Sequence, residues 1–145
     1  RDHPGAALLL DFGREGALGE SLQALRRQTP EPVLANPGEA DLAAHVDFAA
    51  IAKAASIAGA HAFGPLAQGA FLNALGIEAR ASALARAEPS RAAEVALAVS
   101  RLTGTRAMGR LFQALALTSP NLAAPAGFEA AAHRRAAVLA EEDEP

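Results

Sequence analysis

Apolar residues in the first third of the chain occur in one short run and then at wider spacing. Residues 8–12 form the run, which a glycine ends, and this pattern predicts a buried strand of the parallel-sheet kind. Leu18, Leu22 and Leu25 follow at helical spacing. Residues 29–39 contain three prolines, so they predict a loop that is long enough to lie near a site.

Helix caps and helix breakers divide the remaining two thirds of the chain. The predicted elements are a helix from an Asp47 N-cap to Gly59, a strand at 60–63, helices at 68–75 and 77–87, a helix from a Ser90 cap to Gly104, a strand at 111–118, a loop at 120–127 and an alanine-rich helix. This alternation of strands and helices predicts an α/β sheet.

Composition narrows the range of functions. A net charge of -3 and a pI near 5.8 argue against nucleic-acid binding. The chain has no cysteine and no apolar run that reaches the roughly 18 residues of a membrane span. Alanine dominates the apolar residues and buries little area, so the predicted core is thin and needs a partner surface, either another domain or another subunit of a homo-oligomer.

The apolar run begins only a few residues after Arg1. We therefore expect the sequence to be the carboxy-terminal part of a longer protein. Residues 1–128 are expected to form the carboxy-terminal half of one domain, and residues 129–145 an alanine-rich helix with an acidic tail. The absence of a signal peptide predicts a cytoplasmic setting for a bacterial protein.

Four polar residues are candidates for a site. Asp11 ends the first predicted strand, where ligands of open α/β sheets bind, although a turn residue would look the same. His45 and Asp47 stand together at a helix start, either facing a cleft or serving as an exposed imidazole and a helix cap. Gln68 is either a substrate-facing amide or an ordinary residue at the start of a helix.

Other patterns favour structural roles. Gly13, Gly16 and Gly19 superficially resemble a phosphate cradle, but their spacing favours a flexible turn. The four histidines lack the spacing of a helical metal site. A modest basic cluster surrounds Gly104 and Gly109, and clusters of this kind are more often a solvated face than an anion site. Its members are Arg101, Arg106 and Arg110.

Six segments, taken together and in order, resemble one protein family. They are residues 8–13, 18–24, 37–48, 64–72, 75–80 and 108–112. The most distinctive is 37–48, Pro-Gly-Glu-Ala-Asp-Leu-Ala-Ala-His-Val-Asp-Phe, which departs from the family pattern by having Ala43 where threonine is usual. Phe12 likewise replaces the usual tyrosine. The sequence is similar to the MidA-type family of S-adenosylmethionine-dependent methyltransferases, relatives of a mitochondrial complex I assembly factor.

The resemblance implies the carboxy-terminal part of a Rossmann-like class I methyltransferase sheet with added helices. Residues 8–12 would be its fifth strand and residues 60–63 and 111–118 its last two strands. It also implies S-adenosylmethionine as the cofactor and a protein arginine as the substrate, with a respiratory complex I subunit as an expected partner and a mitochondrial location in a eukaryote. Asp11, His45 and Asp47 would serve catalysis and Gln68 would bind substrate.

The family's glycine-rich cofactor loop and its Asn-Glu-x-x-Asp segment are missing from these 145 residues. We therefore expect the chain alone neither to bind the cofactor nor to catalyse. Two other hypotheses remain open at this point. One is a non-catalytic interaction module for assembly, and the other is an unrelated α/β domain that binds a small molecule.

Overall fold

The computed structural model describes residues 3–16 and 19–131. Its elements, in chain order, are β1 (Ala6–Arg14), β2 (Gln23–Arg26), β3 (Thr29–Glu31), β4 (Asp41–Ala43), β5 (Val46–Asp47), α1 (Phe48–Ile57), β6 (His61–Ala67), α2 (Gln68–Ala74), α3 (Ile77–Ala87), a 3-10 turn (Pro89–Arg91), α4 (Ala92–Thr103), α5 (Met108–Leu111) and β7 (Phe112–Thr118). The predicted alanine-rich helix falls mostly on residues 132–145, outside the described residues.

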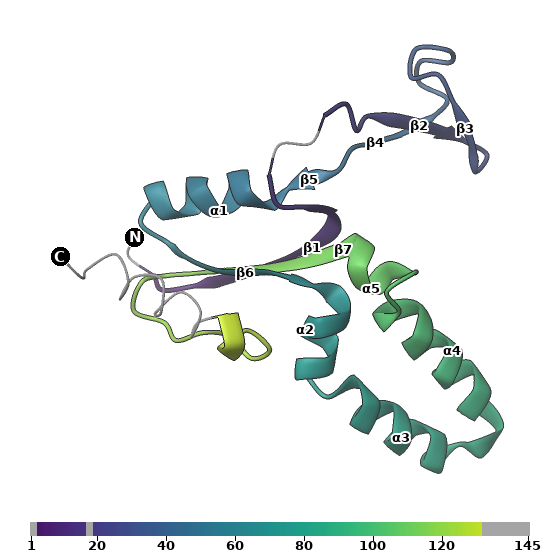
Figure 1. The fold of residues 1–145 in the computed structure, drawn as a ribbon, viewed down its shortest axis with the longest axis vertical. Helices are drawn as coiled ribbons and strands as arrows, with labels where there is room; N and C mark the ends of the chain where they lie inside the picture. The colour runs from purple at the N-terminus through teal and green to yellow at the C-terminus, as the bar shows by residue number, and fades with distance from the viewer. Residues whose placement is uncertain (1–2, 17–18, 132–145) are drawn as a thin grey trace.

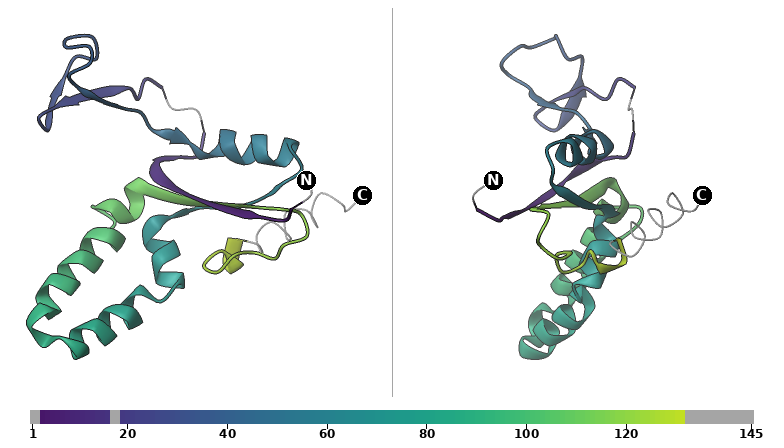
Figure 2. Two further views of the ribbon diagram at one scale, coloured as in Figure 1. Left: turned by 180° about the vertical axis from the view of Figure 1, so that it is seen from behind. Right: turned by 90° about the vertical axis from the view of Figure 1, so that its left-hand side faces the viewer.

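A mixed sheet of four strands in the order β5-β1-β7-β6 forms the body of the molecule (Figure 1). Strand β7 lies between β1 and β6 and is antiparallel to both, so β1 and β6 run in the same direction. Helix α1 lies over one face of this sheet, whereas α2 and the segment around Phe128 lie against the other (Figure 2). The predicted α/β class is confirmed, and the three predicted strands correspond to β1, β6 and β7 of this sheet, whereas β5 was not predicted.

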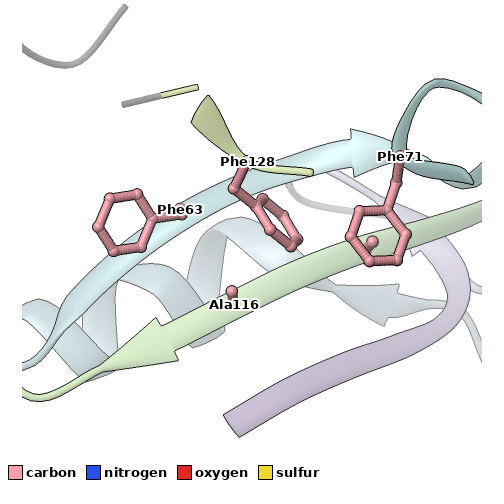
Figure 3. Packing of buried hydrophobic residues seen from close by; sticks show 5 residues of the cluster. Phe63, Phe71, Ala116 and Phe128 are labelled. Atoms are coloured by element: carbon pink, nitrogen blue, oxygen red, sulfur yellow. The ribbon is translucent and has the colours of Figure 1, made fainter. Parts of the chain in front are cut away.

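Phenylalanine side chains fill the core because most other apolar residues are alanine. Phe63, Phe71 and Phe128 pack over Ala114 and Ala116 of β7 on one face (Figure 3). Leu115 alternates to the opposite face, which α1 covers, and is fully buried there, as is Phe48 at the start of α1. The core is thin, as the composition predicts.

Residues 23–43 form a small antiparallel sheet in the order β3-β2-β4, which projects from the body (Figure 1). We call it the β arm. The helical spacing of the leucines does not correspond to a helix, because Leu25 lies in β2 and Leu22 precedes that strand, while Leu18 lies outside the described residues. The predicted loop is also wrong in part, since β3 occupies its beginning. Arg26 stabilises the arm by ion pairs with Glu31 at 3.3 Å and Glu39 at 2.9 Å.

Helices α3 and α4 form an antiparallel hairpin that projects from the other side of the body (Figures 1 and 2). We call it the helical arm. Its helices match the predicted ones, but the N-cap prediction for Ser90 is wrong. That residue lies in the 3-10 turn, and α4 begins after Arg91 with no side-chain cap. Gly104 ends α4 as predicted.

Strand β1 is exposed along one edge and on one face. Strand β5 pairs with it only at Gly13 and Arg14, so residues 6–12 have no strand partner on that side within the described residues. Leu8 and Leu10 are 53% and 42% exposed. The prediction of a buried strand is therefore wrong for this chain, because nothing in the described residues covers the outer part of β1.

We expect this exposed strand to make the isolated chain bind hydrophobic dyes and self-associate, since unpaired apolar edges template pairing with other chains. Dye fluorescence and light scattering should both fall in Leu8→Lys/Leu10→Lys. Leu34→Lys is the matched control, because Leu34 is 85% exposed but lies in the β arm. A parent chain that stays monomeric and does not increase the fluorescence of the dye would contradict the prediction.

Candidate functional site

The candidate residues gather at the carboxyl end of β1. Asp11 pairs in register with Gln113 of β7, and Ala67 of β6 pairs with Gln113 from the other side. Side chains of directly opposed residues point to the same face, so Asp11 and Gln113 share a face of the sheet. Gln68 follows Ala67 immediately and starts α2. The sheet thus brings Asp11 and Gln68 to one end.

His45 is held at the same end by an aromatic contact. Its ring meets Phe12 edge-on, with centroids 5.4 Å apart, and Phe12 in turn meets Phe112 at 6.0 Å. The His45 backbone N–H donates to Ser21 Oγ at 3.2 Å. The Phe12 ring positions the imidazole through packing.

A glycine allows β5 to approach β1 closely enough for these contacts. Any Cβ at Gly13 would collide with the backbone carbonyl of Val46, its register partner in β5. Gly13 therefore allows β5 to pair closely with β1, and this position offers no space for a phosphate or cofactor. The interpretation of the glycine series as a turn is therefore wrong for Gly13, which lies within β1, whereas Gly16 follows that strand with a positive φ of 88.

Asp47 caps α1. Its Oδ1 accepts from the Ala50 N–H at 3.0 Å, which confirms the predicted N-cap. The residue is half-buried, and its Oδ2 has no hydrogen-bond partner among the described residues. Capping thus uses one carboxylate oxygen and leaves the second for a ligand.

Asp11 and Gln68 differ in accessibility. The Asp11 carboxylate is exposed, and its Oδ1 accepts from the adjacent Phe12 N–H at 2.8 Å. Gln68 is only 5% exposed, and its Nε2 donates to the Leu102 carbonyl at 2.9 Å. The Gln68 amide therefore ties the start of α2 to the end of α4, and its predicted role in substrate binding remains a prediction.

Two residues at this end were not among the predicted candidates. Gln113 lies beside Asp11, and its Nε2 donates to the Arg110 carbonyl at 3.0 Å. Phe112 completes the aromatic row with Phe12 and His45. Neither carries a sequence signal of its own, because only the strand register brings them to the site.

The part of the chain that the structure describes contains neither a cluster of metal ligands nor a membrane-spanning helix. No group of three or more histidine or acidic side chains there is arranged to hold a metal ion. No helix in the same residues has the length and apolarity required to cross a bilayer. Among the described residues, the ion pair with altered titration lies far from the site, at the start of α4, where a hydrogen bond from exposed Arg91 lowers the pKa of Glu94.

Comparison with known proteins places this geometry in a family. The sequence profile of a family described as putative S-adenosyl-L-methionine-dependent methyltransferases matches residues 1–66. The chain is 35% identical over 122 residues to the mitochondrial protein arginine methyltransferase NDUFAF7 homolog of Drosophila melanogaster. The aligned residues cover 83% of this chain and 28% of that protein. It is 34% identical over 110 residues to NDUFAF7 of Danio rerio, covering 75% of this chain and 26% of the relative.

Solved structures share the fold. An uncharacterized protein from Burkholderia thailandensis superposes with a TM-score of 0.78 at 29% identity, over 87% of this chain and 36% of its own. A second structure from that organism, of a likely methyl transferase with bound S-adenosyl-homocysteine, gives a TM-score of 0.77 at 29% identity, over 86% of this chain and 34% of its own.

Sheet order, helix placement and these neighbours define a Rossmann-like α/β fold of the class I methyltransferase type. The chain belongs to the MidA-type family of S-adenosylmethionine-dependent methyltransferases. It spans about a quarter of the length of the curated relatives it matches, with 28% and 26% for the two described above. S-adenosylmethionine is the cofactor of this family.

Proposed function

We propose that the chain forms the distal, substrate-facing part of a methyltransferase that modifies arginine side chains of proteins. The observation that carries the proposal is the convergence of Asp11, His45 and Asp47 at the carboxyl end of β1, the end where open α/β sheets bind ligands. The names of the relatives support arginine as the target residue.

The proposed mechanism rests on holding a guanidinium in place. S-adenosylmethionine supplies an electrophilic methyl group, and the substrate nitrogen must be aligned with it, so positioning contributes most of the rate. The exposed Asp11 carboxylate and the free Oδ2 of Asp47 can each accept N–H groups of a guanidinium. His45, fixed against Phe12, borders the same end and excludes water from one side. Gln68 is proposed to bind substrate through its carbonyl oxygen, since its amide nitrogen is engaged.

The residues present do not fit the cofactor itself. The glycine that follows the core of β1, Gly13, sits against Val46 and cannot form a cradle. We propose that the chain is inactive by itself and that the cofactor-binding half of the domain lies along the open edge of β1. A parallel strand placed there would pair with the free backbone groups of residues 6–12.

We expect calorimetry to detect no binding of S-adenosylmethionine to this chain at millimolar concentration. A version of the protein extended upstream by the glycine-rich loop should bind in the micromolar range, because backbone N–H groups can then approach the ligand. S-adenosyl-homocysteine serves as the second ligand for both proteins. Micromolar binding by the 145-residue chain would contradict the proposal.

Several finer points belong to the same proposal. The substrate is a protein, and the family resemblance suggests a respiratory complex I subunit. A mitochondrial location is proposed for a eukaryotic source, in line with the relatives' names, and a cytoplasmic one for a bacterial source. Self-association through β1 would give a homo-oligomer when the strand is otherwise uncovered.

The two projecting arms favour a second candidate function, a non-catalytic module for assembly. Both arms expose side chains on several sides and bury few residues of their own, and the described part of the helical arm has none that is fully buried. A measurement of methyl transfer by the extended protein distinguishes the two candidate functions. An extended protein that binds cofactor and partner but never transfers a methyl group would favour the assembly module.

A further inference from the structure

Positive charge is concentrated where the helical arm joins the body. Residues 95–128 contain three charged side chains, and all three are arginines. Arg101 lies in the last turn of α4, Arg106 in the turn that follows, and Arg110 in α5. All three are exposed. We call them the arginine cluster.

The cluster has no neutralising partner. Within residues 3–16 and 19–131, the ion pairs involve only Arg26 and Arg91 among the arginines. Helix α5, which carries Arg110, contacts α2, α4, β1, β6 and β7. Residues 54–77, which include α2 and β6, contain no Asp or Glu. Asp11 of β1 and Glu94 of α4 form no ion pair with the cluster within the described residues. Glu78 is the nearest acidic residue along α3, and it lines the groove between α3 and α4 without pairing with Arg101. The arginine charges are therefore available to a ligand.

The cluster is held rigidly beside the candidate site. A Cβ on Gly69 would lie 2.6 Å from the Thr103 carbonyl, so α2 and the end of α4 touch backbone to backbone. Arg110 directly precedes Leu111 and Phe112, and the Phe112 ring contacts Phe12, whose ring contacts His45. The chain thus carries acidic groups at the end of β1 and an arginine cluster next to them, on a fixed frame.

We infer that the arginine cluster docks an acidic segment of the protein substrate, next to the arginine that enters the site. This inference rests on the proposed function, and it deepens it by naming the class of substrate: an arginine flanked by Asp or Glu. The acidic groups at the end of β1 then bind the substrate arginine, and the arginine cluster binds the acidic residues beside it. This arrangement selects substrates that carry both charges close together and disfavours uniformly basic segments. Leu111, 50% exposed, offers an apolar contact next to the cluster.

Peptide binding tests this inference without methyl transfer. The probe is a short fluorescent peptide with a central arginine flanked by glutamates, followed by anisotropy, and the matched peptide has glutamine at each glutamate. We expect the acidic peptide to bind more tightly, and its affinity to fall as salt is added. The variant Arg106→Gln/Arg110→Gln should weaken the acidic peptide by roughly fivefold to tenfold, the sum of two exposed ion pairs, and leave the glutamine peptide unchanged.

Arg27→Gln/Arg86→Gln is the matched control, because it removes the same charge from the tip of the β arm and the far end of α3. It should bind like the parent. Equal affinity for the two peptides, an equal loss in the control, or no binding of either peptide would overturn the inference. Tighter binding of single-stranded RNA than of the acidic peptide, lost in Arg106→Gln/Arg110→Gln, would overturn it in favour of nucleic acid. Failure of methyl transfer in the extended protein would leave these binding results standing, so the two proposals fail separately.

Discussion

Replacing Asp47 by asparagine is expected to lower methyl transfer by tenfold or more in the upstream-extended protein while leaving its melting temperature unchanged. Asparagine caps a helix as well as aspartate does, so the bond to Ala50 survives and α1 stays in place. The substitution removes the negative charge of the free Oδ2, which a bidentate guanidinium contact requires. A charge-assisted hydrogen bond is worth roughly 1.5–3 kcal/mol, and that corresponds to a factor of about ten or more in rate.

Two companion variants locate the effect. His45→Gln should also lower the rate, because the imidazole shares that end of the sheet and packs on Phe12. Asp41→Asn is the matched control, since this exposed aspartate in β4 loses the same charge without lying at the site. If both Asp47→Asn and His45→Gln keep the parent's rate of methyl transfer and its melting temperature, the role of these two residues is purely structural.

The body of the fold could be predicted from the sequence because its signals are local and strong. Asp47 caps α1, Gly104 ends α4, and short segments rich in apolar residues mark β6 and β7. The β arm could not be predicted in the same way. Its strands have three or four residues, and its hairpin turn uses Arg27 and Gln28 at φ 49 and 64, without the glycine or asparagine that usually announces such a turn.

The site was predictable only in part, for a related reason. Asp11, His45 and Asp47 stand at strand and helix ends, so the sequence indicates their position. Gln113 and Phe112 join them through the register of β7 against β1, a long-range pairing with no local signal. The burial of Gln68 also depends on a distant segment, the end of α4. The exposure of Leu8 and Leu10 depends on what lies beyond β1, so no local pattern could reveal it.

A single methyl group at Gly109 is expected to cause a large loss of stability. Gly109 of α5 lies against the Thr103 backbone so closely that any Cβ there would overlap the Thr103 carbonyl and Cα. The contact is backbone to backbone, so no side chain can rotate away and α5 or the end of α4 must shift. Gly109→Ala should lower the free energy of unfolding by about 3 kcal/mol, the upper part of the range for overpacked sites.

Thermal melts measure this effect, with an expected drop of about 10 °C for a chain of this size. Gly19→Ala is the matched control, because a Cβ at Gly19 meets nothing within 4 Å and its backbone is not left-handed, so its melt should stay at the parent value. The displaced segment also carries the Leu102 carbonyl that holds Gln68, and Arg110 lies in the same short helix. Weaker binding of the acidic peptide should therefore accompany the lower melt. A Gly109→Ala protein with the parent's melting temperature would show that α4 and α5 can separate freely, and the rigid placement of the arginine cluster would then be wrong.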